Sequence, residues 1–219
     1  MRLLDELQGM LQQTYDLAGE HRVSDFLTGN PALVEALGIM PGTAGAGEQV
    51  LVSQQDADCV DLAVYIAPEV LERLGESDPL EALHDSNLAD FLMALEGVSH
   101  FVYLAWNAGL DKPVTRLELE LQGEVDKFVL TALVLATRQG RAPDALHHGL
   151  FRRCRLEPSL DDESRARYQA ASRYAETYCR GLLERFRRKR DMSTLWPELR
   201  RFYRLTQRGK MARIDYACA

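Results

Sequence analysis

The first part of the chain alternates between helix-like and strand-like patterns of apolar residues. Leucines and methionines at near-helical spacing predict a helix over 2–18, and Pro and Gly at opposite ends mark two short helices, 30–38 and 68–75. Apolar and polar residues alternate in 49–54 and 59–66, on either side of the short loop QDAD. Because this alternation includes β-branched residues in both stretches, we expect an antiparallel hairpin.

The next stretch begins with a helical pattern over 86–97 and continues as a run over 99–106 that is apolar on both alternating faces. Ser86 as a cap and Gly97 as a stop predict a helix over 86–97. In 99–106 both alternating faces are apolar, and the Phe, Val, Tyr and Trp residues favour a strand. We therefore expect a strand that is covered on both faces, with a buried helix as the competing interpretation.

The segment LELELQGEVDKFVLTALVLA has an acidic, alternating start and an almost continuous apolar end. Thr115 followed by Glu118 matches the capping box, and acids are favoured near a helix N-terminus. The apolar end is too long for a typical strand, so we expect one helix over 115–138, buried all round in its second half. The alternative is a strand over 114–122 followed by a helix from Gly123, a residue that costs a helix about 1 kcal/mol relative to alanine.

The remainder of the chain has helical patterns, which predict helices over 144–153, 158–190 and 193–214. The longest of these has Ser159 as a candidate cap, acids in its first turn, arginines in its last turn and one apolar stripe. The predicted fold class is α+β: a small antiparallel sheet, from the hairpin and 99–106, packed against a long buried helix, with a C-terminal helical array.

Charge divides the chain into two parts. Residues 1–140 hold 7 Lys and Arg against 23 Asp and Glu, a charge of −16, and residues 141–219 hold 19 against 10, a charge of +9; together they give the −7 of the whole chain. We expect an acidic α+β portion over 1–140, with short N-terminal helices, the sheet and the central helix 115–138, and a basic all-helical portion over 141–219 packed on it as one compact unit.

The spacing of the cysteines and the length of the apolar runs indicate where the protein is located and whether it holds a cofactor. No two cysteines form a CxxC pair, which argues against a zinc knuckle or a thioredoxin-like motif and favours reduced thiols. No apolar run approaches the roughly 20 residues that cross a bilayer. We therefore expect a cytoplasmic protein with no membrane segment and no cofactor. The four cysteines are Cys59, Cys154, Cys179 and Cys218.

Three glutamates and one histidine are the candidates for a catalytic or metal site. Glu120 and Glu124 are four residues apart on the predicted helix, and Glu96 and His100 are also four apart, although Gly97 argues against a shared helix there. If the long helix packs against 99–106, the four side chains converge as in the carboxylate and histidine metal sites of helical bundles, or as a general acid–base pair. The Glu-x-x-His spacing of bundle sites is absent, and an acid-rich helix start paired with basic side chains is the alternative.

The arginine-rich C-terminal helices predict a second kind of surface. Arginines interleaved with aromatic residues suit nucleic-acid binding, but arginine also pairs well with carboxylates, and the protein as a whole is acidic. We expect these helices to dock on the acidic start of the long helix, within one chain or across a dimer. The residues expected in this charge-pairing or partner surface are Glu118, Glu120, Glu124, Asp126, Arg187, Arg188, Arg190, Arg201, Arg204 and Arg208.

Motifs for nucleophilic catalysis, phosphate-binding loops and dinucleotide binding are absent from the sequence. The favoured hypothesis is a non-enzymatic, bacterial-type cytosolic protein-interaction or regulatory module that binds another protein or itself. Two alternatives are a metal-dependent enzyme that uses the Glu/His cluster and a nucleic-acid-binding protein that uses the Arg/aromatic C-terminal helices.

Overall fold

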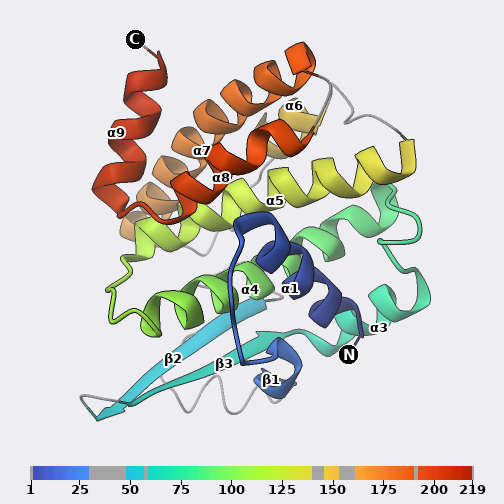
Figure 1. Ribbon diagram of the computed structural model, residues 1–219. Helices are drawn as coiled ribbons and strands as arrows, with labels where there is room; N and C mark the ends of the chain where they lie inside the picture. The colour runs from blue at the N-terminus through green and yellow to red at the C-terminus, as the bar shows by residue number, and fades with distance from the viewer. Residues whose placement is uncertain are drawn as a thin grey trace.

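The computed structural model describes residues 2–29, 48–56, 59–139, 146–152, 161–189 and 192–218, which are mostly helical (Figure 1). The helices, with two short 3-10 helices marked η, are α1 (Arg2–Tyr15), η1 (Val23–Asp25), α3 (Pro68–Glu76), α4 (Asp85–Ala108), α5 (Arg116–Gln139), α6 (Leu146–Arg152), α7 (Asp162–Lys189), η2 (Met192–Leu195), α8 (Trp196–Tyr203) and α9 (Gln207–Cys218). The strands are β1 (Leu27–Thr28), β2 (Glu48–Asp56) and β3 (Cys59–Ile66).

The sheet has the strand order β1-β3-β2. Strands β2 and β3 pair antiparallel, with Val50 opposite Val64, at the positions where the sequence predicted a hairpin. The two-residue strand β1 pairs in parallel with β3. The sheet is therefore mixed rather than antiparallel, and its third strand is not the predicted segment 99–106.

The predicted α+β fold class is wrong, because residues 99–106 are helical and the protein is mostly helical. They belong to α4, which passes through Gly97 without a break and packs against α1, α3, α5 and the sheet. Residues 97–103 are all buried. A helix covered on every side is apolar on every side, so it gives the pattern of a strand buried on both faces. Tertiary packing here overrides the strand preference of aromatic and β-branched residues.

The single long helix predicted over 115–138 is confirmed by α5. The Thr115 hydroxyl accepts a hydrogen bond from the backbone N–H of Glu118 at 3.1 Å, which is one half of the predicted capping box. The Glu118 carboxylate does not make the other half, which is a hydrogen bond with the backbone N–H of Thr115. It accepts hydrogen bonds from the Tyr103 hydroxyl and from the backbone N–H of Gln207, so it joins α5 to α4 and α9.

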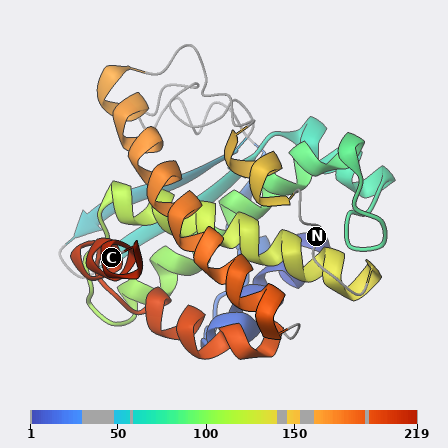
Figure 2. The same ribbon diagram turned by 90° about the horizontal axis from the view of Figure 1, so that it is seen from above.

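Helix α5 lies at the centre of the molecule. It packs against α4 on one side and α7 on the other, and the sheet lies beyond α4 (Figure 1). Seen from above, α7 crosses over α5, and α9 is viewed along its axis (Figure 2). One continuous hydrophobic core joins these layers, so the interface of α4 with α5 is deeply enclosed.

The C-terminal region is helical, as the sequence predicted, but the last predicted helix is divided. The single helix expected over 193–214 is η2, α8 and α9, with a break at Arg204–Thr206. Thr206 begins the next helix: its hydroxyl accepts a hydrogen bond from the N–H of Gly209, and its carbonyl accepts one from the N–H of Lys210. The helix expected over 30–38 and the cap expected at Ser159 lie outside the described residues.

Among the described residues, α4 meets the length and composition criteria for a helix that crosses a bilayer. Of its most apolar window, 56% is buried inside the protein. Core helices of soluble proteins meet the same criteria, so this finding is weak evidence for membrane insertion. The absence of a membrane segment stays a prediction.

Candidate functional site

Ionisable side chains line the interface of α4 with α5. Because α4 continues through Gly97, Glu96 and His100 lie one turn apart on the same helix face. Glu120 and Glu124 are likewise one turn apart on α5. With Lys127, these four residues form what we call the His100 cluster.

Three of the four predicted site residues converge. One possible ligand atom from each of Glu96, His100 and Glu120 lies within 4.8 Å of the other two. The Nε2 atom of His100 is 3.8 Å from a carboxylate oxygen of Glu120, which is too long for a hydrogen bond. Within the part of the chain that the structure describes, this Nε2 atom has no hydrogen-bond partner, although His100 is only 6% exposed. Nearly all buried polar atoms have a partner, so the atom calls for an explanation.

Lys127 holds the fourth predicted residue, Glu124, in an ion pair. The Lys127 ammonium donates to Glu124 at 2.7 Å and to Glu96 at 2.9 Å. Burial opposes the charge on Lys127, but the two carboxylates outweigh burial and hold its pKa well above the ordinary value. Glu96 therefore belongs both to the convergent trio and to the ion pair.

Gly123 makes room for the imidazole of His100. A Cβ atom at position 123 would lie 2.8 Å from His100 Nε2, closer than real Cβ contacts. The glycine therefore has a packing reason in the middle of a helix, where it costs about 1 kcal/mol relative to alanine. Sequence analysis noted only that cost, because the partner of Gly123 is on another helix.

Burial also determines which members of the trio are charged. Burial lowers the pKa of His100 to about 4, so the imidazole is neutral near pH 7. Burial, and then the charge of Glu96, raises the pKa of Glu120 to about 8. Burial opposes the ionisation of Glu96, but the charge of Lys127 prevails and its pKa is lowered. The trio thus offers one neutral imidazole nitrogen and two carboxyl groups.

A second buried cluster lies on the same interface, and we call it the Asp126 cluster. The Asp126 carboxylate accepts hydrogen bonds from the hydroxyls of Tyr15 and Ser99 and from the amide of Gln122. The Gln122 carbonyl accepts a hydrogen bond from the ammonium of Lys210 on α9. Burial raises the pKa of Asp126 to about 6 and lowers that of Lys210 to about 7. Each of these five side chains has a hydrogen-bond partner.

Aromatic rings complete the surroundings of Lys210. Its ammonium lies 4.6 Å from the ring centre of Tyr103 and 4.9 Å from that of Phe202, within the range of cation–π attraction. Lys210 and Ile214 are the buried side chains of α9 among those the structure describes. A buried amine therefore anchors this helix to the rest of the protein.

The acids at the start of α5 have nearer partners than the C-terminal arginines. Glu118 is buried and bonds to α4 and α9 as described above, and Asp126 lies in its own cluster. Glu120 is near Arg167 and accepts a hydrogen bond from Tyr168, both on α7. Arg167 and Tyr168 belong to the basic part of the chain, but neither is among the residues expected in the charge-pairing surface.

Arg204, one of the predicted arginines, contacts α1 and α4. Arg204 donates to the backbone carbonyls of Tyr15 and Asp16 and lies over the ring of Trp106. Arg190 lies outside the described residues. The role of this group as a partner surface stays a prediction. The exposed members of the group are Arg187, Arg188, Arg201, Arg204 and Arg208.

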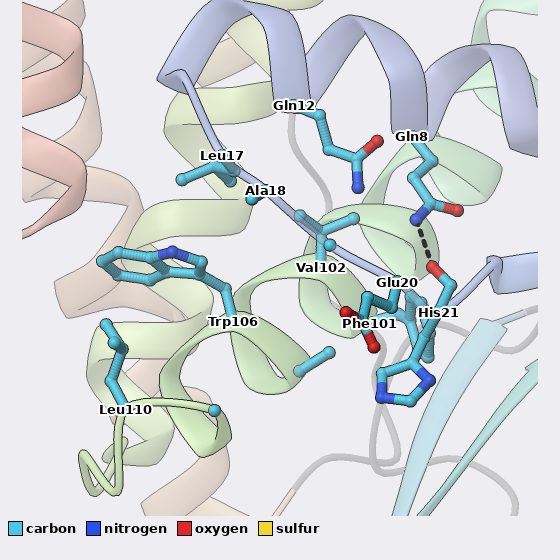
Figure 3. A pocket seen from close by; sticks show the side chains of 13 residues that line it. Gln8, Gln12, Leu17, Ala18, Glu20, His21, Phe101, Val102, Trp106 and Leu110 are labelled. Carbon is cyan, nitrogen blue, oxygen red and sulfur yellow. Dashed lines mark hydrogen bonds between the residues drawn. The ribbon is translucent and has the colours of Figure 1, made fainter.

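A cavity of about 420 Å³ lies between α1, the segment 17–21 and α4. Figure 3 shows the amides of Gln8 and Gln12 on one side of it and the side chains of Val102 and Trp106 on another. The Gln8 amide donates to the backbone carbonyl of His21. This cavity has no signature in the sequence, because its walls come from separate segments and none carries a motif.

No family model matches this chain, and no curated protein or solved structure matches it either. Its own geometry is therefore the basis for a proposal about function.

Proposed function

We propose that this protein binds a divalent transition-metal ion through Glu96, His100 and Glu120 at the interface of α4 with α5. The observation that carries the proposal is the Nε2 atom of His100: a buried nitrogen without a hydrogen-bond partner among the described residues, 3.8 Å from a carboxylate oxygen of Glu120. Gly123 keeps the space around this atom open. Imidazole nitrogen and carboxylate oxygen are the usual donors for zinc, and manganese and iron also accept them.

The separations within the trio are close to those of a metal site. Donors bound tetrahedrally to zinc lie roughly 3.3 Å from one another, given bond lengths of about 2.0–2.1 Å. The trio's atoms lie within 4.8 Å of one another, and His100 Nε2 is 3.8 Å from Glu120. Side-chain rotations that move the glutamate oxygens by about one ångström bring them into range.

Charge supports the same proposal. Two carboxyl groups are held together in the protein interior, and the charge of Glu96 works against ionisation of Glu120. A bound divalent cation reverses this effect, because it is the largest local charge and favours the ionised carboxylate. Three protein donors also leave further coordination positions for water, as in catalytic zinc sites.

A cobalt titration of the full-length protein tests the proposal. Protein stripped of metal with a chelator is titrated with Co²⁺ and followed by visible absorption, and bound zinc is measured by elemental analysis. Wild type is expected to take up one equivalent, and both His100→Leu and Glu120→Gln are expected to lose it. His148, an exposed histidine on α6, provides the control, and His148→Ala should bind like wild type. Absence of stoichiometric binding, or binding that survives both substitutions, would contradict the proposal.

Metal binding is compatible with more than one biological role. The interaction-module and nucleic-acid hypotheses, and the cytoplasmic location, stay predictions. An enzyme of the metal-dependent class would use the same trio, and a regulatory protein would use it as a sensor.

A further inference from the structure

We infer that Lys127 is a built-in competitor of the metal ion, and that its release makes Glu124 a fourth protein ligand. The inference rests on the proposed function, since it concerns the same site. It assigns a regulatory role to a residue that otherwise counts as one half of an ion pair.

The position of the Lys127 ammonium carries the inference. It lies 2.9 Å from Glu96, a member of the trio, and 2.7 Å from Glu124, which lies one helical turn from Glu120. The three side chains of this ion pair are mostly buried. The ammonium thus neutralises carboxylates in the place where a metal ion needs them.

The Lys127 ammonium donates hydrogen bonds to the two carboxylates but not to the imidazole of His100. Lys127 is close enough for its charge to lower the pKa of His100, yet its hydrogen bonds in the structure go to Glu96 and Glu124. His100 Nε2 stays without a partner. A metal cation accepts electron pairs from nitrogen as well as from oxygen, so it binds the imidazole and the carboxylates together. The Lys127 ammonium bonds only to the carboxylates.

Competition follows from the charges. An ammonium and a divalent ion repel each other strongly over a few ångströms in the protein interior, so both cannot share Glu96 without a large cost. Binding of the ion therefore requires Lys127 to withdraw. Withdrawal leaves Glu124 without its partner, and a carboxylate beside a metal ion is better used as a ligand than left unpaired.

Removal of the lysine charge tests the inference. Lys127→Met and Lys127→Gln are compared with wild type by calorimetric titration with Zn²⁺ in the presence of a competing chelator. Because the repulsion is gone, both variants should bind zinc roughly tenfold or more tightly. Lys210→Met is the matched control: it removes a buried lysine from the Asp126 cluster and should leave zinc affinity unchanged. Adding Glu124→Gln to Lys127→Met should reverse most of the gain.

The outcomes separate the two proposals. If wild type binds zinc and Lys127→Met binds equally or more weakly, the inference fails while the proposed function stands. If neither protein binds zinc, the proposed function itself fails. Removal of Lys127 leaves two carboxylates uncompensated, so the variants are also followed by thermal unfolding with and without zinc. A larger zinc-induced rise in melting temperature than in wild type supports the inference, and the absence of any rise overturns it.

Discussion

The Asp126 cluster and the His100 cluster lie on the same helix interface and differ in how completely their polar atoms are paired. In the Asp126 cluster each side chain has a hydrogen-bond partner, and α9 is anchored through Lys210. In the His100 cluster one imidazole nitrogen has none. A fully paired buried network fixes one structure, whereas an unpaired buried atom costs stability. This difference favours a structural role for the first cluster, and it is the basis for proposing a ligand at the second.

Of the substitutions that test this comparison, Asp126→Ala is expected to reduce the unfolding free energy most. It leaves the hydroxyls of Tyr15 and Ser99 without their acceptor and removes one of the two carboxylates, with that of Glu118, whose charges act on Lys210. Breaking a buried charged network in this way costs about 3–5 kcal/mol in unfolding free energy, measured by urea denaturation. Asp126→Asn, which keeps one acceptor oxygen, should lose less. A loss below about 1 kcal/mol for the alanine variant would show that the cluster does not stabilise the fold.

The pH dependence of stability tests the charge state of Lys210. Burial lowers its pKa from 10.5 to about 7 in the folded protein. Between these two pH values the unfolded chain therefore binds more protons than the folded protein. The contribution of Lys210 to stability is complete above its unfolded pKa, and it is lost as the pH falls through its folded pKa. From pH 7 to 9 wild type should gain stability relative to Lys210→Met, by at most about 1.4 kcal/mol per pH unit. A constant difference across this range would show that Lys210 does not titrate there.

Gly123→Ala is expected to have a smaller effect on stability and a clear one on metal binding. The new methyl group meets His100, and overpacking costs about 1–3 kcal/mol, which a gain of about 1 kcal/mol in helix preference offsets in part. We expect a net loss of roughly 1 kcal/mol in urea denaturation, together with weaker cobalt binding. Gly181 on α7 is the matched control, because a Cβ atom added there would meet nothing within 4 Å and alanine should stabilise the helix. Stabilisation at both positions with unchanged cobalt binding would contradict the role given to Gly123.

His100→Leu is expected to change stability least. Replacing an unpaired buried polar group with an apolar one of similar size is nearly neutral or stabilising, so the unfolding free energy of metal-stripped protein should stay within about 1 kcal/mol of wild type. Metal binding should be lost in the same variant. A loss comparable to that of Asp126→Ala would mean that His100 serves the fold in the same way as the Asp126 cluster.

Local patterns predicted the long helix and the hairpin because short-range signals specify both. The capping pattern and the long apolar end of α5 favour a helix, and alternating apolar and polar residues favour the strands β2 and β3. The path of α4 could not be predicted in this way. Residues 97–103 are all buried, so periodicity there does not distinguish helix from strand, and Gly97 resembles a helix stop.

Sequence spacing singled out three residues that the fold brings together, but it could not predict their geometry. Glu120 and Glu124 share a helix face at any packing, whereas Glu96 and His100 do so only because α4 continues through Gly97. The space beside Gly123 and the position of Lys127 between two carboxylates depend on how the helices pack. The anchoring of α9 by Lys210 was missed for the same reason, since a lysine in a basic segment resembles a surface residue.

A crystal structure of the full-length protein grown with zinc, with anomalous data collected at the zinc edge, tests the central claim most directly. The account predicts one anomalous peak between Glu96, His100 and Glu120, bonded to His100 Nε2, with the Lys127 ammonium withdrawn from Glu96. No peak at His100, with Lys127 still joining Glu96 to Glu124, would contradict it.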